Sequence, residues 1–300
     1  MSHHNPTCFA HHMGLYMIDH NWMKSAKLMM TLCPSEIMAN YKPQEAYQQY
    51  LNAENIVERR ELYGITASGI AVIPIVGVMT KGSSKFGTST LDTRRALREA
   101  TNDPKVRAIM LHLDTPGGSF AGLDDLAGAI ATAAQSKPLH AHADDLVASA
   151  GMYAASQAQR LTINKTGEAG SIGTYAVIQD TSGAADLAGV KVHLISTGEF
   201  KGMGAPGVPI TDAQLDRLQR SVNQAQSFFS AALQRGRNLT AEQVESLVAD
   251  GGTYFADEAK RLGLVDAVET YEQSLEALAN QINPTRRNSL NRRMRVMTMG

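Results

Sequence analysis

The 300-residue chain contains little cysteine, no excess of charge of either sign and no long apolar run. Its two cysteines, Cys8 and Cys33, lie near the N-terminus, so we expect no disulfide framework and favour a reducing compartment such as the cytoplasm. The formal net charge of −1 argues against bulk binding to nucleic acid or to an anionic membrane. No stretch approaches the ~18 consecutive apolar residues of a membrane span, so no membrane anchor is expected.

The first 65 residues differ in composition from the rest of the chain. Five of the nine histidines precede residue 40, which raises the question of a metal site. The candidate ligands are His3, His4, Cys8, His11 and His12. Because their spacing is not that of a zinc site, we favour a polar N-terminal segment, partly helical or mobile, and expect no metal and no cofactor. Residues 44–61 are predicted to form a charged helix that leads into the core.

From residue 70 onward, apolar runs typical of buried strands alternate with amphipathic stretches typical of helices. Strands are predicted at 71–78, 106–113, 139–143, 160–163, 175–178 and 190–195, and helices at 89–100, 123–134, 151–159, 183–188, 211–235, 241–250 and 256–262. This alternation predicts an α/β protein with a parallel sheet and helices on both faces. We expect the folded domain to span 66–270. The remainder, 271–300, should be helical and then a basic, disordered tail, which we favour over a docking segment for an acidic partner.

Two short segments 52 positions apart carry the strongest chemical signal. Residues 148–151 place Ser149 on a small-residue turn at the expected head of a helix, and residues 198–202 place Lys201 between glycines. A serine hydroxyl is a weak nucleophile that needs an adjacent base. A lysine can be that base once burial lowers its pKa toward ~7–8. Taken singly, Ser149 fits a helix N-cap equally well, and Lys201 fits a solvated loop.

Two further features belong to the same pattern. Residues 115–119 follow a predicted strand, and their paired glycines let consecutive N–H groups approach a ligand, as an oxyanion hole requires. The Ala150 N–H, at the helix start after Ser149, is a second candidate donor. The turn at 170–173 holds Ser171, which can orient a neutral lysine amine. Each segment alone is also a plain turn, but the four in this order predict nucleophilic catalysis.

Histidine offers an alternative base. His112, His140, His142 and His193 would permit a Ser-His-Asp arrangement. Their places along predicted strands favour structural roles instead. Asp144 and Asp145, just before the serine turn, are expected to be solvated in a loop, although either is close enough in sequence to contact a substrate backbone.

The order and spacing of the four segments resemble the signal peptide peptidase A (protease IV) family, including its phage prohead-protease branch. The resemblance covers about residues 66–270, and residues 256–266 also fit it. It implies a Clp/crotonase-like fold, a spiral of ββα units that assembles into homo-oligomeric rings. By position it implies Ser149 as nucleophile, Lys201 as general base and Ser171 as the residue that holds the lysine. It places the oxyanion donors at Gly118 and Ala150.

The activity implied by the resemblance is that of a serine endopeptidase that works by acyl transfer. The family commonly has Ser-Gly-Gly-Tyr at the nucleophile, whereas this chain has Ala150 and Met152 and keeps Gly151 and Tyr153. Alanine still supplies an N–H, so the oxyanion role is expected to survive. The change to Met152 bears on substrate preference instead.

The missing anchor, the 65 preceding residues and the basic tail favour a phage or prophage capsid maturation protease. Such an enzyme would cleave capsid, portal or scaffold proteins inside the prohead, in the host cytoplasm. The alternatives are a cytoplasmic signal-peptide-peptidase-like hydrolase of a bacterium, an inactive scaffold protein, and an acyl-CoA enzyme of the crotonase type. The last would need no lysine base and should bind coenzyme A.

Overall fold

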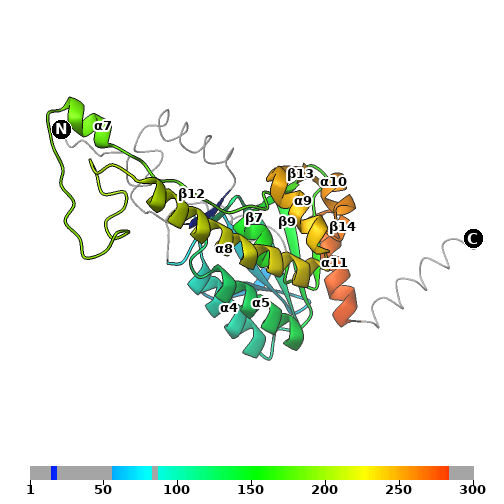
Figure 1. Cartoon of the computed structure of the whole chain (residues 1–300). Helices are drawn as coiled ribbons and strands as arrows, with labels where there is room; N and C mark the ends of the chain where they lie inside the picture. Colours follow the sequence, from blue (N-terminus) through cyan, green and yellow to red (C-terminus); the bar gives the residue numbers. More distant parts are fainter. Residues whose placement is uncertain (1–14, 19–55, 83–86, 284–300) are drawn as a thin grey trace, which may run out of the picture.

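The apolar runs of the chain form the centre of a mostly parallel sheet in the computed structural model of the protein, which describes residues 15–18, 56–82 and 87–283. Helices cover both faces of this sheet (Figure 1). The predicted α/β class with a parallel sheet and helices on both faces is therefore confirmed. The candidate metal ligands near the N-terminus and the basic tail lie outside the described residues.

Three parallel strands make the centre of the main sheet: β4 (Ile70–Val76), β7 (Ala108–Thr115) and β9 (Leu139–Ala148). Nearly all residues of β4 and β7 are buried, as expected for strands covered by helices on both sides. The flanking strands are β11 (Glu168–Gly170) and β13 (Thr253–Phe255) beyond β9, β3 (Gly64–Thr66) and β2 (Ile56–Arg59) beyond β4, and β10 (Arg160–Ile163) with β14 (Ala267–Val268) on a branch from β9.

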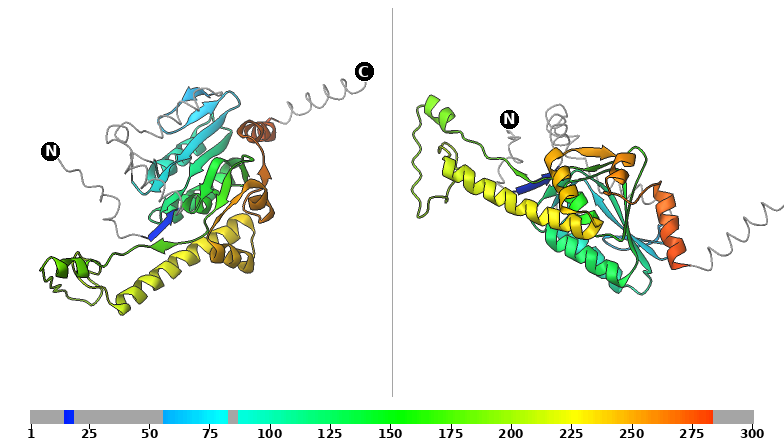
Figure 2. Two further views of the ribbon diagram at one scale, coloured as in Figure 1. Left: turned by 90° about the horizontal axis from the view of Figure 1, so that it is seen from above. Right: turned by 45° about the vertical axis from the view of Figure 1, so that its right-hand side comes forward.

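The larger apolar core lies on one face of this sheet. The helices that contribute to it are α4 (Thr90–Asn102), α5 (Leu123–Ser136), α6 (Ala150–Ala155), α8 (Asp212–Arg237), α9 (Ala241–Asp250) and α10 (Ala256–Arg261). On the opposite face, α11 (Tyr271–Ile282) packs against Val72 and Met110 (Figure 2). Within the described ranges, no helix combines the length and the apolar character that a membrane crossing demands.

A second, smaller sheet lies at the end of the central strands. Its order is β12 (Tyr175–Ala176), β1 (Leu15–Ile18), β8 (Gly117–Ser119), β5 (Val78–Thr80) and β6 (Gly87–Ser89). Gly77, with a φ of +70°, bends the chain between β4 and β5. The single strand predicted at 71–78 is therefore two strands that belong to different sheets.

Residues 177–211, called here the lysine arm, leave the body between β12 and α8. Figures 1 and 2 show α7 (Ser182–Leu187) and the loop after it well away from both sheets. The arm is held mainly by its own hydrogen bonds: Thr181 Oγ1 accepts from the Gly207 N–H at 2.8 Å, and an Asp180 carboxylate oxygen accepts from the Ile210 N–H at 3.0 Å. The strand predicted at 190–195 is wrong, because no described strand lies beside this stretch to pair with its backbone.

The charged helix predicted at 44–61 is wrong over its described part. Residues 56–59 form β2, which pairs antiparallel with β3. Ile56 packs against the smaller apolar core, and the strand pairs with β3, so these contacts decide the conformation rather than the local charge pattern.

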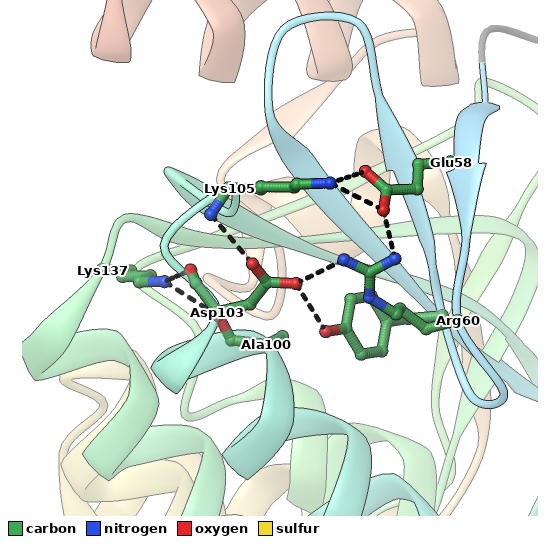
Figure 3. A network of polar contacts seen from close by, with 7 residues as sticks. Glu58, Arg60, Ala100, Asp103, Lys105 and Lys137 are labelled. Atoms are coloured by element: carbon green, nitrogen blue, oxygen red, sulfur yellow. Dashed lines mark hydrogen bonds and ion pairs between the residues drawn. The ribbon is translucent and has the colours of Figure 1, made fainter.

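A polar network ties β2 to the turn after α4 (Figure 3). The Asp103 carboxylate accepts from Arg60 Nη2 at 3.1 Å and from the Lys105 N–H at 2.8 Å. Lys137 Nζ donates to the carbonyl oxygens of Ala100 and Asp103 at 2.9 and 2.8 Å, which satisfies the end of α4. The hydrogen bond from the Lys105 amide is the main reason that the pKa of Asp103 lies below its usual value. This network joins the chain that follows the edge strand β2 to the end of α4.

Two helical glycines should respond oppositely to alanine. Gly128 of α5 is exposed and has no atom within 4 Å of a Cβ position, so Gly128→Ala should raise the free energy of unfolding by about 0.5–1 kcal/mol. At Gly236 of α8 a Cβ would lie 2.2 Å from the backbone oxygen of Ser156, so Gly236→Ala should lower that free energy by about 1–3 kcal/mol. Urea unfolding of both variants measures the difference, and equal effects would contradict the close packing of α8 on α6.

Candidate active site

Ser149 stands at the junction of β9 and α6. Its backbone (φ 53°, ψ −115°) is rare for a residue other than glycine. The Ser149 N–H donates to the Gly170 carbonyl at 2.9 Å, which helps to hold this conformation. The side chain is fully buried, and Oγ has no hydrogen-bond partner among the described residues. A buried hydroxyl without a partner costs folding free energy. A sharp turn from strand to helix is also the setting in which some nucleophilic serines are held.

Ser171 lies next to this turn because of the register between β9 and β11. Ala148 pairs with Gly170 in the parallel ladder, so the residues that follow them, Ser149 and Ser171, lie at the same edge of the sheet. Ser171 also has a positive φ of 54°, and its N–H donates to the Gly252 carbonyl at 2.6 Å. The structure therefore brings the two predicted serines together, each on a strained turn.

The two predicted oxyanion donors lie on either side of the contact between β8 and α6. Ala150 is the first residue of α6, where N–H groups have no partner inside the helix. Gly118 is the middle residue of β8, and a Cβ there would lie 1.9 Å from the Met79 carbonyl oxygen, so only glycine fits. Thr115 Oγ1 braces the turn by accepting from the Gly117 N–H at 3.1 Å.

Lys201 is not brought to this cluster by the single chain. It is exposed on the lysine arm, in a turn where its N–H donates to the Gly198 carbonyl at 3.1 Å. Because Ser149 Oγ has no hydrogen-bond partner in the described part of the chain, the Lys201 amine does not reach it. His193, one of the alternative bases, is likewise exposed on the arm.

The buried histidines His112 and His142 contact Asp144 of β9 rather than Ser149. His112 Nε2 lies 2.8 Å from a carboxylate oxygen of Asp144, and the second Asp144 oxygen lies 3.6 Å from His142 Nε2. Burial lowers the pKa of His112. Burial also opposes ionisation of Asp144, but hydrogen bonds with the two histidines hold its pKa below the usual range. The geometry fits a neutral His112 that donates to an ionised Asp144. The expectation that Asp144 is solvated in a loop is wrong, since it lies within β9.

Asp114 is a titratable residue near the site that the sequence patterns did not single out. It occupies the position on β7 just before Thr115, and its carbonyl accepts from the Gly77 N–H at 2.9 Å. Burial, with the nearby charges of Asp145 and Asp144, raises the pKa of Asp114 to about 6. The only available signal was an acidic residue between a buried strand and a glycine turn, which is also common at plain turns.

The raised pKa of Asp114 predicts a pH-dependent stability. The folded chain binds this proton more tightly than the unfolded chain, so stability falls as pH rises from ~4, the ordinary aspartate pKa, to about 6. Asp114→Asn should therefore be more stable than the parent by about 1–2 kcal/mol at pH 8 and equally stable below pH ~4. Urea unfolding between pH 4 and pH 8 checks this, and a difference that is independent of pH would contradict it.

Known proteins are similar to this chain in sequence. The model of peptidase family S49 matches residues 131–284, a range that contains Ser149, Ser171 and Lys201. Capsid assembly protease C of Escherichia phage lambda is 30% identical over 223 residues, which cover 72% of this chain and 50% of that protein. Protease 4 of Salmonella typhi is 27% identical over 216 residues, which cover 71% of this chain and 35% of that protein. The chain thus spans half the length or less of these two relatives.

Among solved structures, the ClpP protease catalytic domain from Plasmodium falciparum aligns with a TM-score of 0.43 and 13% identity. The alignment covers 67% of this chain and 86% of the ClpP chain. The family assignment depends on the sequence match instead, which extends over more than half of the 300 residues. The chain belongs to peptidase family S49.

Proposed function

We propose that the protein is a serine endopeptidase in which Ser149 is the nucleophile and Lys201 the general base. The observation that carries this proposal is the strained turn that holds Ser149 fully buried, with an Oγ that lacks a hydrogen-bond partner among the described residues. Membership of family S49 supports it, because the matched range includes both residues. Ser149 and Ser171 follow paired residues of the adjacent strands β9 and β11, so Ser171 is suited to orient the lysine amine.

The chemistry is acyl transfer. The neutral amine of Lys201 takes the Oγ proton of Ser149 as Oγ bonds to a peptide carbonyl carbon, and the carbonyl oxygen becomes an oxyanion. N–H groups of Gly118 and Ala150 would stabilise that oxyanion from β8 and α6. The protonated lysine then gives its proton to the departing amine, and water hydrolyses the acyl-enzyme with the lysine again acting as base.

A neighbouring copy is the natural source of the lysine. The lysine arm exposes large apolar side chains that the single chain does not cover, above all Leu187, 94% exposed, and Ile195, 95% exposed. Exposed apolar surface of this kind marks an interaction site. We infer a homo-oligomeric ring in which the arm of one copy packs on the next and brings Lys201 to its neighbour's Ser149.

The relatives support a proposal for the substrate class. A phage protein named as a capsid assembly protease covers 72% of this chain, which favours capsid, portal or scaffold proteins as substrates, within a prohead in the host cytoplasm. A bacterial Protease 4 covers 71%, so a signal-peptide-peptidase-like hydrolase is the second candidate. The purified protein should be incubated with candidate capsid, portal and scaffold proteins and with signal peptides. New termini mapped by mass spectrometry then distinguish the two.

Replacing either member of the pair should abolish peptide hydrolysis. Ser149→Ala and Lys201→Ala should each lower kcat/KM by roughly 10³-fold or more. Lys201→Arg should not restore activity, because a guanidinium stays charged and cannot accept a proton. Lys191→Ala is the matched control, since Lys191 is an exposed lysine on the same arm and should be dispensable. Substantial hydrolysis by Ser149→Ala would refute the nucleophile.

A site shared between copies should show complementation. Mixing inactive Ser149→Ala with inactive Lys201→Ala should restore part of the activity, because some neighbours in a mixed ring then combine an intact serine with an intact lysine. Native mass spectrometry checks whether mixed rings form. Two results together would assign both residues to one chain. The first is that mixed rings form and remain inactive. The second is that an excess of Lys201→Ala protein, mixed with wild-type protein, does not inhibit the wild-type copies.

A further inference from the structure

A strand from the chain's own N-terminal segment lies in the slot beside the predicted oxyanion strand. β1 pairs antiparallel with β8, with Tyr16 opposite Ser119, Met17 opposite Gly118 and Ile18 opposite Gly117. On its other side β1 pairs antiparallel with β12, through Leu15 and Tyr16. Figure 2 shows this blue strand against the body, beside the start of the lysine arm.

The two edges of β8 pair with different strands. Its first edge pairs in parallel with β5, where Gly118 lies against Met79 so closely that no side chain fits. The second edge presents peptide groups toward the side on which β1 lies. An uncovered strand edge is a template for any extended peptide. The chain itself supplies that peptide here.

The slot is one strand wide. Within the described ranges, β12 joins the small sheet only through β1, so β8 and β12 flank the space that β1 fills. Neighbouring strands lie ~4.8 Å apart, which places β8 and β12 about 9.6 Å from each other. An extended peptide in this space gains backbone hydrogen bonds on both sides, which is recognition by strand addition and depends little on sequence.

The slot also borders the nucleophile. β8 packs against α6, which begins directly after Ser149, and Ser149 Oγ is fully buried without a hydrogen-bond partner among the described residues. A peptide paired with Gly118 is therefore held by the strand that packs against the helix after Ser149. This is the geometry that a scissile peptide needs in the proposed mechanism.

We propose that residues 15–18 occupy the substrate strand of the active-site cleft, so that the N-terminal segment is an internal competitor of polypeptide substrates. The inference rests on the proposed function only for the identity of the competing ligand. The occupied slot itself follows from the backbone pairing of β1. A substrate segment displaces β1 by forming the same hydrogen bonds to β8 and β12.

Proline in β1 tests the proposal. Consecutive N–H groups of a strand point to opposite sides, so Tyr16→Pro combined with Met17→Pro removes one donor toward β8 and one toward β12, whichever way the strand faces. The control is Lys24→Pro combined with Ser25→Pro, outside β1. Both pairs are placed in full-length Ser149→Ala protein, so that the probe is not hydrolysed. The probe is a fluorescent peptide with the sequence of residues 12–21 of this chain.

Release of the slot should tighten binding of this peptide by at least ~tenfold in fluorescence anisotropy, relative to the control pair. Equal dissociation constants in the two variants would overturn the proposal. A second measurement needs no change in β1. In Ser149→Ala protein, hydrogen exchange of residues 15–18 should be slow alone and fast when the peptide saturates the slot. Fast exchange without peptide, or no change on its addition, would also overturn it.

These readouts separate the two proposals. Peptide hydrolysis by otherwise wild-type protein carrying the β1 prolines should exceed that of the parent if both hold. If no variant hydrolyses any peptide, the proposed function fails, and the binding and exchange results still decide whether β1 fills a peptide slot.

Discussion

The parallel register between β9 and β11 is the constraint on which the serine cluster depends. Ala148 pairs with Gly170, the Ser149 N–H donates to the Gly170 carbonyl, and the Ser171 N–H donates to the Gly252 carbonyl ahead of β13. Gly170 has a φ of +143°, and a Cβ there would lie 2.6 Å from the Gly252 oxygen. A slip of β11 by one residue would turn its side chains to the other face of the sheet and separate Ser171 from Ser149. The direction of α6, and with it the position of the Ala150 N–H, follows from this pairing.

Much of the fold could be predicted from local patterns, because its central strands are continuous apolar runs and its helices carry clear caps. Thr211 and Thr240 each begin a helix with a reciprocal cap to a glutamine three residues later. β8 and β1 could not be predicted in this way, because three or four residues acquire strand structure only from distant neighbours. The run at 190–195 was wrongly predicted as a strand because its apolar pattern is that of a strand, although no described strand lies beside it to pair with its backbone. Apolar side chains that stay exposed in the single chain look the same in sequence as those of a core.

The candidate site also contains residues whose positions could be predicted and residues whose positions could not. The family resemblance implied that Ser149, Ser171, Gly118 and Ala150 share one site. The pairing of β9 with β11 and the packing of β8 on α6 bring these segments together. The position of Lys201 could not be predicted, because its arm takes part in no described sheet and order along the chain says nothing about where such a segment points. The raised pKa of Asp114 and the close contact between His112 and Asp144 depend on cross-strand neighbours, which periodicity along one strand does not reveal.

The long helix α8 makes the arm a mechanical lever. Its buried apolar residues, Ala225, Phe229, Ala232 and Leu233, all lie in its second half, and the first half projects from the body with the arm at its end (Figure 1). The 13 residues of α8 before Ala225 span ~20 Å, so a tilt of only about 5° at the anchored end moves the tip by roughly 1.7 Å. That displacement is large compared with the tolerance of a hydrogen bond. Stiffness at the root of α8 is thus a quantity on which selection can act without touching any residue of the serine turn.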